Sequence, residues 1–379
     1  MDGRFGSFST NRLDKKELET LITNGIESTR YLAVDESRML ADPARYYKGG
    51  KPDLQLFDKK LYEVNPDDKV AIARAAAEEV LGKDERIISV DSSYSDGEGS
   101  SYRLISNGFE GESKSTWFSV SASVSIKGEG EARPQDYWYD SALFYDKLTK
   151  AGIGAKALER VLRKLGQKKA KSGKYTMVVD PMNVGNLLSP MLSALYGSAL
   201  QQKNSFLMDK LDTKVASDLF TLRDEPHAIG ANGSRYFDNE GVATEPRTVF
   251  DKGVLKTYFI DTYNGKKMDI APTISAPSRL ILTPGDKDLN GLVADIKQGI
   301  LVTGFNGGNS NSSTGDFSYG IEGFLIEDGK LTQPVNEMNV TGNMVTLWNS
   351  LVAVGNDPQP NRSWQIPSLV FEGVDFSGL

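Results

Sequence analysis

The sequence contains no cysteine and only one histidine, His227. Without cysteine, the chain can form no disulfide, thiolate metal site or cysteine nucleophile. A Ser-His-Asp triad could use only His227 as its base, and a lone histidine in a loop-like stretch such as DEPHAIGANG is more often solvated than catalytic. Zinc sites usually need sets of cysteine or histidine ligands, so a zinc site on this chain is almost excluded. A site for Mg²⁺ or Ca²⁺ that uses only carboxylates is still possible.

The chain has no excess of positive charge, because 51 acidic residues outnumber 44 lysines and arginines and the formal net charge is −7. Such a field opposes non-specific binding to nucleic acid, which depends on neutralising phosphates. There is one basic cluster, formed by Arg160, Arg163, Lys164, Lys168, Lys169, Lys171 and Lys174. We favour a helix C-terminus that continues into a solvated linker over a nucleic-acid patch. We therefore expect no nucleic-acid partner.

Long apolar runs are absent as well. No segment approaches the roughly 18 apolar residues that cross a bilayer, and the N-terminus lacks the layout of a signal peptide. We therefore expect a cytoplasmic protein that makes no use of a membrane. The 379 residues, of which 39% are apolar and 25% charged, are typical of a globular protein with two or three domains.

The first half of the chain alternates helical and strand patterns. Helical spacing predicts helices in LDKKELETLITNGIESTRYLAVD, NPDDKVAIARAAAEEVLG and GAKALERVLRKLG, the second capped by Asn65 and ended by Gly82. ERIISVDSS and SYRLISNGFEG read as strands around a loop at Tyr94–Ser100. FSVSASVSIKG alternates strictly, which predicts a strand whose apolar face is buried.

The second half is predicted to be mainly antiparallel β structure with few helices. KYTMVVD reads as a buried strand, and DKG and EDG read as hairpin turns at Asp251–Gly253 and Glu327–Gly329. Lys168–Lys174 has no apolar residue larger than alanine and is taken as the boundary between domains. We therefore predict an α+β protein with a mixed domain at 1–171 and a β-rich domain at 172–379.

Three motifs have a structural and a functional interpretation. GFNGGNSNSSTGDFS (304–318) is neither a phosphate loop nor a Rossmann turn, and it suits a mobile surface loop as well as a ligand-lining one. Asp238 and Glu240 could serve as acid and base, but capping of a turn is favoured. NLLSPMLSALYGSALQQKNSFL (186–207) carries a stripe that predicts an ordinary core helix, with Leu188, Leu192 and Leu195 inward.

Several segments in order resemble the TldD/PmbA family over nearly the whole chain. They are GSFSTNRLD (6–14), MVVDPMNVGNLLSPMLSALYGSALQQKNSFL (177–207), RYFDNEGVATEPRTVFDKGVLKTYFIDTYNGKKM (235–268), LTPGDKDLNGLVADIKQGILVTGFNG (282–307), STGDFSYGIEGFLIEDGKL (313–331), NMVTLWNSLVAVGND (343–357) and PSLVFEGVDFSG (367–378). The Phe-Asp-Asn-Glu-Gly and Thr-Gly-Asp-Phe-Ser blocks are the specific parts. Their order and spacing make the resemblance strong.

The resemblance implies that the metal site has been lost. The TldD-like branch carries a His-Glu-x-x-x-His zinc motif after a Leu-Leu pair, and a cysteine near the C-terminus completes its site. Here Ser189 and Ala194 stand at the two histidine positions, Pro190 stands at the glutamate position, and the cysteine is missing. The chain therefore resembles the PmbA (TldE)-like branch, and we expect no catalytic residue, metal or other cofactor in it.

For that branch, the resemblance implies a non-catalytic subunit of a cytoplasmic metallopeptidase complex. The partner would be a TldD-like subunit whose zinc activates a water, and the substrates would be small unfolded peptides. The chain would form a heterodimer with that partner, or a homodimer in isolation, and it would be inactive alone. This chain would shape the chamber and bind peptide by strand addition at an exposed sheet edge. The candidate peptide-binding residues are Asp238, Glu240, Gly241, Gly315, Asp316 and Ser318.

Two alternatives remain open at this point. One is an interaction protein that modulates DNA gyrase, a label of the family that we expect to reflect peptide processing rather than direct contact. The other is an independent hydrolase that uses carboxylates such as Asp238, Glu240 and Asp316, with Mg²⁺. The chain also starts only a few residues before its Gly-x-x-Ser-Thr-Asn block, where relatives have further strands. If strands are missing, we expect the N-terminal sheet to expose an edge.

Overall fold

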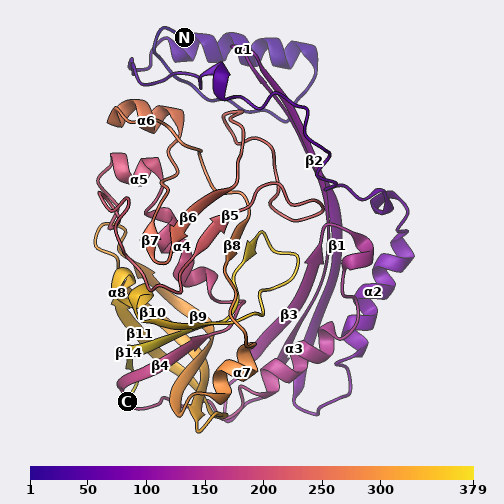
Figure 1. Ribbon diagram of the computed structural model, residues 1–379. Coiled ribbons are helices and arrows are strands. Elements are labelled where there is room, and N and C mark those ends of the chain that lie inside the picture. The colour runs from indigo at the N-terminus through magenta and orange to yellow at the C-terminus, as the bar shows by residue number, and fades with distance from the viewer.

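The computed structural model describes residues 1–379 and has an α+β fold, as predicted. The chain builds three sheets, and its two termini lie at opposite ends of the molecule (Figure 1). No helix combines the length and the hydropathy that crossing a bilayer requires.

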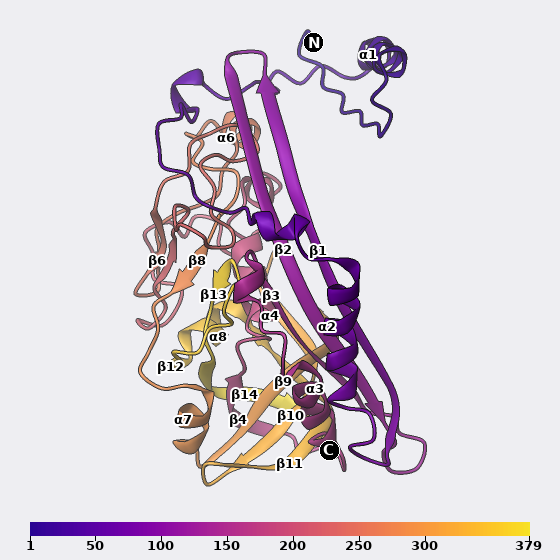
Figure 2. The same cartoon turned by 90° about the vertical axis from the view of Figure 1, so that its right-hand side faces the viewer.

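A long antiparallel hairpin dominates the first sheet, whose strand order is β1-β2-β3. In Figure 2 the hairpin runs along most of the length of the molecule. The strands are β1 (Ile87–Ile105), β2 (Phe109–Ile126) and β3 (Gln135–Ala142). The loop predicted at Tyr94–Ser100 is wrong, because β1 continues through it and each residue of this stretch pairs with β2, with Gly97 opposite Trp117. Cross-strand pairing therefore overrides the turn-forming residues.

The N-terminal half contains three helices, of which α2 and α3 pack on the first sheet. They are α1 (Lys15–Thr29), α2 (Pro66–Glu78) and α3 (Ile153–Leu162), with short 3₁₀ turns at Pro43–Arg45, Lys59–Tyr62 and Tyr145–Lys147. The predicted cap of α2 is confirmed, because the Asn65 side chain accepts a hydrogen bond from the Asp68 backbone N–H. The predicted burial of one face of β2 is also confirmed, since Phe118, Val120, Ala122, Val124 and Ile126 pack against α2 and α3.

The second sheet is the main support of the C-terminal half. Its strand order is β11-β10-β9-β4-β14-β12, and a further pairing of β11 with β14 closes five of the strands into a ring. The strands are β4 (Gly173–Val179), β9 (Gln298–Ser310), β10 (Asp316–Glu327), β11 (Lys330–Asn343), β12 (Leu351–Val354) and β14 (Leu369–Ser377). In this sheet only β4 and β9 pair in parallel, and in the C-terminal half the only other parallel strand pair is β8 with β13, so the prediction of mainly antiparallel structure holds.

A third sheet of short strands lies above this ring in Figure 1, with order β13-β8-β5-β6-β7. Its strands are β5 (Leu222–Asp224), β6 (Arg247–Asp251), β7 (Val254–Leu255), β8 (Leu280–Leu282) and β13 (Trp364–Gln365). The helices of this half are α4 (Gly185–Ser193), α5 (Gly197–Gln201), α6 (Thr262–Met268), α7 (Leu289–Ala294) and α8 (Met344–Asn349). Both predicted hairpins form, β6–β7 at Lys252-Gly253 and β10–β11 at Asp328-Gly329.

The glycine-rich stretch 304–318 is not a surface loop. Most of it belongs to β9 and β10, and only the turn between Ser310 and Asp316 is irregular. Strand pairing with β10 satisfies the backbone of β9, so a sequence that looks mobile is held in a hairpin.

Candidate functional site

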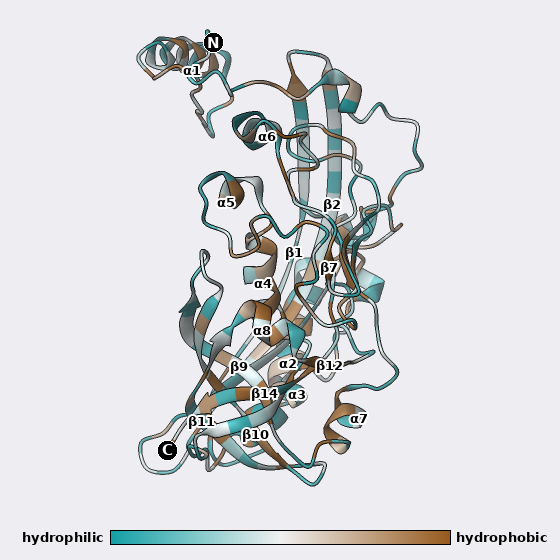
Figure 3. Ribbon diagram, turned by 60° about the vertical axis from the view of Figure 1, so that its left-hand side comes forward, coloured by the Kyte–Doolittle hydropathy of each residue, from teal (hydrophilic) through white to brown (hydrophobic).

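Helix α4 lies at the centre of the largest core, which joins the second and third sheets. In Figure 3 it is coloured as one of the hydrophobic helices of the C-terminal half. The predicted stripe is confirmed: Leu188, Leu192 and Leu195 are at most 2% exposed. The indole Nε1–H of Trp348 donates to the carbonyl of Leu187 at 3.4 Å. Burial and this contact fix the helix independently of any ligand.

The three positions that the resemblance assigns to the metal site do not fit zinc. Ser189 is exposed, Pro190 is half-buried inside the helix, and Ala194 is only 2% exposed. Proline and alanine have no ligand atom, and Ser189 stands alone on the outer side of the helix. The structure contains no group of three or more histidine, cysteine or acidic side chains arranged to hold a metal ion. The three side chains at these positions therefore do not form a zinc site.

Asp238 is a buried structural carboxylate at the centre of a turn. Its Oδ1 atom accepts from the backbone N–H groups of Glu240 and Val242, both at 2.9 Å, and its Oδ2 atom accepts from that of Ser275 at 3.0 Å. The side chain is 2% exposed. These contacts match the favoured turn-capping interpretation, because they engage both carboxylate oxygens with the backbone.

Glu240, two residues further on, reaches the start of α6. Its Oε2 atom accepts from the Thr262 backbone N–H at 2.9 Å and from the Thr262 hydroxyl at 3.0 Å. Burial raises the pKa of Glu240, and the nearby charge of Asp238 raises it further. Gly241 has a positive φ of 78°, and a Cβ there would lie 2.6 Å from the Phe109 ring. This loop therefore packs against the far end of the β1–β2 hairpin.

The second predicted group lies at the turn of the β9–β10 hairpin. Asp316 is exposed, and its carboxylate accepts from the Asn343 amide at 3.0 Å and from the Thr314 hydroxyl at 2.8 Å. These hydrogen bonds, that from Asn343 foremost, lower the pKa of Asp316. Gly315 is buried under Phe206, whereas Ser318 is exposed in the middle of the sheet between Asn309 and Thr341.

The two groups do not converge into one acid–base pair. Asp238 and Glu240 lie in one loop, but no hydrogen bond joins either of them to Asp316. His227 contacts no carboxylate either: its Nε2 atom lies 3.0 Å from the Thr244 hydroxyl, and burial lowers its pKa. The arrangement supplies positions that could hold a peptide but no recognisable nucleophile with a base.

The basic cluster differs from its prediction. Lys169, Lys171 and Lys174 are exposed, but Lys164 is only 8% exposed and Arg160 is also largely buried. Lys164 Nζ lies 3.2 Å from Asp136 Oδ2 and 2.7 Å from Glu322 Oε1. Arg160 does lie in the last turn of α3, as expected of a helix C-terminus, but the burial of Arg160 and Lys164 was not predicted. Their partners lie on β3 and β10, and the sequence gives no sign that these strands meet α3 here.

Two further features could serve function. The outer edge of β1 has no partner strand, and the sequence analysis considered such an exposed edge in the N-terminal sheet. Sequence reasoning missed Asp180, which is 4% exposed and lines a cavity beside Arg160. The position of Asp180 carried a usable signal, because an acidic residue directly after a buried parallel strand often marks a ligand crevice.

Family models match two segments of the chain. The PmbA/TldA metallopeptidase central domain matches residues 59–165, and the C-terminal domain of the same family matches residues 172–378.

Similar proteins carry related names. The chain is 28% identical to a metalloprotease PmbA homolog of Haemophilus influenzae, over 98% of this chain and 83% of that protein. It is 27% identical to metalloprotease PmbA of Escherichia coli O157:H7, over 99% of this chain and 83% of that protein.

Solved structures share the fold. A protein of Bacteroides thetaiotaomicron described as a modulator of DNA gyrase is 74% identical, with a TM-score of 0.98 over 100% of this chain and 86% of that one. TldE of Thermococcus kodakarensis is 22% identical, with a TM-score of 0.82 over 100% of this chain and 88% of that one, a likeness of fold alone.

Proposed function

Because the chain belongs to the PmbA/TldD metallopeptidase family, we propose that it is a non-catalytic, peptide-binding subunit of a metallopeptidase complex. The proposal rests on α4, which keeps its buried leucine face although Ser189, Pro190 and Ala194 replace the metal-site residues. These side chains supply neither a zinc ligand nor a general base. Hydrolysis would then depend on zinc in a TldD-like partner, and this chain would help to hold the substrate.

The outer edge of β1 is the place where we expect a peptide to bind. This strand is 19 residues long and pairs only with β2, so its other side presents unpaired backbone N–H and C=O groups. An extended peptide can add there as a further strand, with main-chain hydrogen bonds that do not depend on its sequence. Tyr102 and Leu104, which are 63% and 71% exposed near the end of the hairpin, offer apolar contacts.

This mode of binding favours small unfolded peptides as substrates. A folded protein keeps its strands paired internally, whereas an unfolded peptide has free backbone groups to pair with an edge. We place the complex in the cytoplasm, in agreement with the absence of cysteine from a chain of this length.

The test of the proposal is reconstitution with a His-Glu-x-x-x-His subunit encoded by the same genome. A tagged chain should retain that subunit from native lysate, and the pair should cleave an unstructured peptide until a zinc chelator is added. The Ser189→Ala variant is the matched control, and its pair should remain within a few-fold of the original activity. Abolished activity, with assembly and melting temperature intact, would show that α4 still carries chemistry.

Peptide binding at β1 has a separate test in amide hydrogen exchange. Alternate N–H groups of β1 point away from β2 and should exchange quickly in the free chain. Saturation with an unstructured peptide should slow those amides and leave the amides bonded to β2 unchanged. Unaltered exchange along β1, while the peptide is demonstrably bound, would place the binding site elsewhere.

A second function, modulation of DNA gyrase, is favoured by one observation. The Bacteroides thetaiotaomicron protein of 74% identity carries that description. The two functions differ in their need for the partner: a direct modulator should change the supercoiling activity of purified gyrase when this chain alone is added. We expect no change, because an effect through peptide processing requires the active complex.

A further inference from the structure

A cavity of about 610 Å³ lies between the first and second sheets, within the size range of small-molecule sites. One wall comes from β3 and α3, and the other from the turn after β4 together with α7 and β10. The two walls fall in the segments matched by the central and the C-terminal family models. None of the six candidate peptide-binding residues lines it.

Most of the charges around this cavity are already paired. Lys164 is held by Asp136 and Glu322, and Lys156 and Arg163 both contact Glu159, at 2.8 Å and 3.6 Å. Asp357 accepts from the backbone N–H groups of Leu289 and Ser368. These groups hold the walls together, and their capacity for a ligand is largely used.

Arg160 differs from Lys164, the other largely buried cation of this cavity. Its Nε–H donates to Asp136 Oδ1 at 3.2 Å, and this is the only hydrogen bond of its guanidinium. The side chain is 16% exposed, so two terminal nitrogens stand in the cavity with little access to bulk water. Such a fork suits a carboxylate, which it can bind through two parallel hydrogen bonds.

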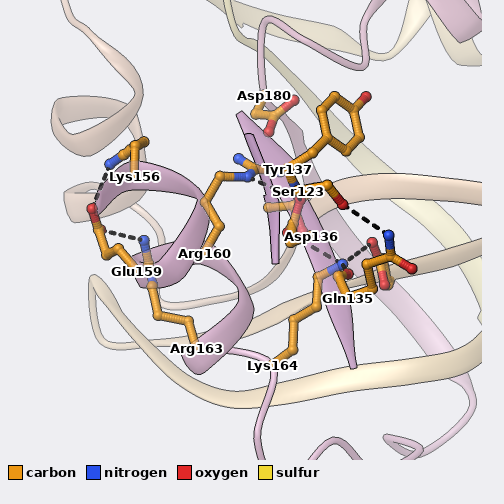
Figure 4. A network of polar contacts seen from close by, with 12 residues as sticks. Ser123, Gln135, Asp136, Tyr137, Lys156, Glu159, Arg160, Arg163, Lys164 and Asp180 are labelled. Atoms are coloured by element: carbon orange, nitrogen blue, oxygen red, sulfur yellow. Dashed lines mark hydrogen bonds and ion pairs between the residues drawn. The ribbon is translucent and has the colours of Figure 1, made fainter. Parts of the chain in front are cut away.

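Asp180 is the buried anion of this cavity that forms no ion pair. Its Oδ1 atom accepts two hydrogen bonds from Asn183, one from the backbone N–H at 3.0 Å and one from the side-chain amide at 2.6 Å. Its Oδ2 atom accepts no hydrogen bond. Burial raises the pKa of this carboxyl, and the charge of Arg160 partly offsets the effect. No direct ion pair joins the two residues, although both line the same space (Figure 4).

We propose that this cavity binds a free amino acid or dipeptide with apolar side chains, its carboxylate on Arg160 and its ammonium on Asp180. One buried cation and one buried anion, each with unused hydrogen-bonding atoms and not in contact with each other, match a zwitterion better than a simple anion. Trp138, Leu289, Val293, Leu301 and Phe324 supply an apolar surface for the side chain. Our interpretation of the ligand as a product of peptide hydrolysis rests on the proposed function, whereas the site itself does not.

The test is calorimetric titration of the purified chain with L-leucine and L-leucyl-L-leucine. At least one should bind, and N-acetyl-L-leucine and L-leucinamide, which each lack one charge, should bind at least about ten-fold more weakly, since each lost charged hydrogen bond contributes on this scale. Inorganic phosphate should not compete. Because the probes act on the unaltered chain and need no peptidase, failure here leaves the proposed function standing.

A variant isolates the contribution of Asp180. Asp180→Asn keeps the shape of the side chain and an acceptor for Asn183. It should weaken the binding of L-leucine about ten-fold, and the binding of L-leucinamide, which keeps the ammonium, at least as much. Lys156→Gln is the matched control, because this side chain lines the same cavity but pairs with Glu159, and it should change affinity less than two-fold, roughly the effect of an exposed pair. The proposal is overturned by no binding of either zwitterion at millimolar concentration, by equal binding of the capped probes, by competition from phosphate, or by unchanged affinity in folded Asp180→Asn.

Discussion

Single residues in this chain show how burial sets the behaviour of a charge. Glu240 is half-buried and bonded to Thr262, and desolvation raises its pKa above the ordinary 4.5. The unfolded chain therefore releases the proton of Glu240 at lower pH than the folded chain does. It follows that the contribution of Glu240 to stability is full below pH 4.5 and is lost as pH rises through its folded pKa.

Glu240→Gln should remove this pH dependence. A glutamine oxygen can still accept from the Thr262 N–H and hydroxyl, but it never carries a charge. The stability of the variant relative to the parent should therefore increase as pH rises from 4.5 and then level off. Chemical denaturation at a series of pH values measures the difference, and a difference that decreases with pH would contradict the assignment.

Residues of α4 should divide by burial rather than by polarity. Leu192 is 2% exposed in the largest core, so Leu192→Ala should lower the free energy of unfolding by roughly 2–5 kcal/mol through lost burial and a cavity. Ser189→Ala and Ser193→Ala, at exposed positions of the same helix, should each cost less than about 1 kcal/mol. Urea denaturation distinguishes them, and a serine variant as costly as Leu192→Ala would refute a purely structural α4.

At the scale of elements, the patterns with one buried face were predictable from the sequence. The alternation in β2, the cap of α2 and the stripe of α4 all depend on local spacing, and all three appear in the structure. The errors fall where long-range pairing decides. Neither Tyr94–Ser100 nor the stretch 304–318 has a strand-like composition, yet partner strands hold both. The cavity beside Asp180 could not be predicted from local spacing either, because its walls are far apart in sequence.

The β9–β10 hairpin offers a test of such pairing at two adjacent glycines. Both have positive φ values, 82° at Gly307 and 96° at Gly308, so alanine is strained at either position. A Cβ at Gly308 would also lie 2.1 Å from the Ser318 carbonyl oxygen, whereas one at Gly307 would meet nothing within 4 Å. Gly307→Ala should cost about 1 kcal/mol and Gly308→Ala at least about 2 kcal/mol, because the second must also distort the strand pair. Equal losses of stability for the two variants in thermal denaturation would mean that the strand pair adjusts to the added Cβ at no measurable cost.

For the molecule as a whole, a buried charge just after the end of α3 connects the segment 59–165 to the segment 172–378. Lys164 contacts Asp136 on β3 and Glu322 on β10, and the side chains of these three residues are 10%, 6% and 17% exposed. Lys164→Met should cost about 3 kcal/mol, because it leaves Glu322 without a partner. Adding Glu322→Gln should recover part of the loss, and Lys156→Met, at an exposed pair, should cost less than about 1 kcal/mol. A double variant as unstable as the single one would show that the charge of Glu322 is not the cause.

The whole chain also carries a prediction about metal. A zinc site needs ligands that converge, but the single histidine, His227, contacts Thr244, and Ser189 and Ala194 lie on opposite sides of α4, one exposed and one buried. We expect the purified chain to hold no stoichiometric zinc and to hydrolyse no peptide alone, with or without added Mg²⁺. Elemental analysis after dialysis against a mild chelator measures the first, with a TldD-like subunit prepared in the same way as the positive control. Near-stoichiometric zinc retained by this chain, or Mg²⁺-dependent cleavage without a partner, would mean that catalysis uses residues other than those inferred from α4.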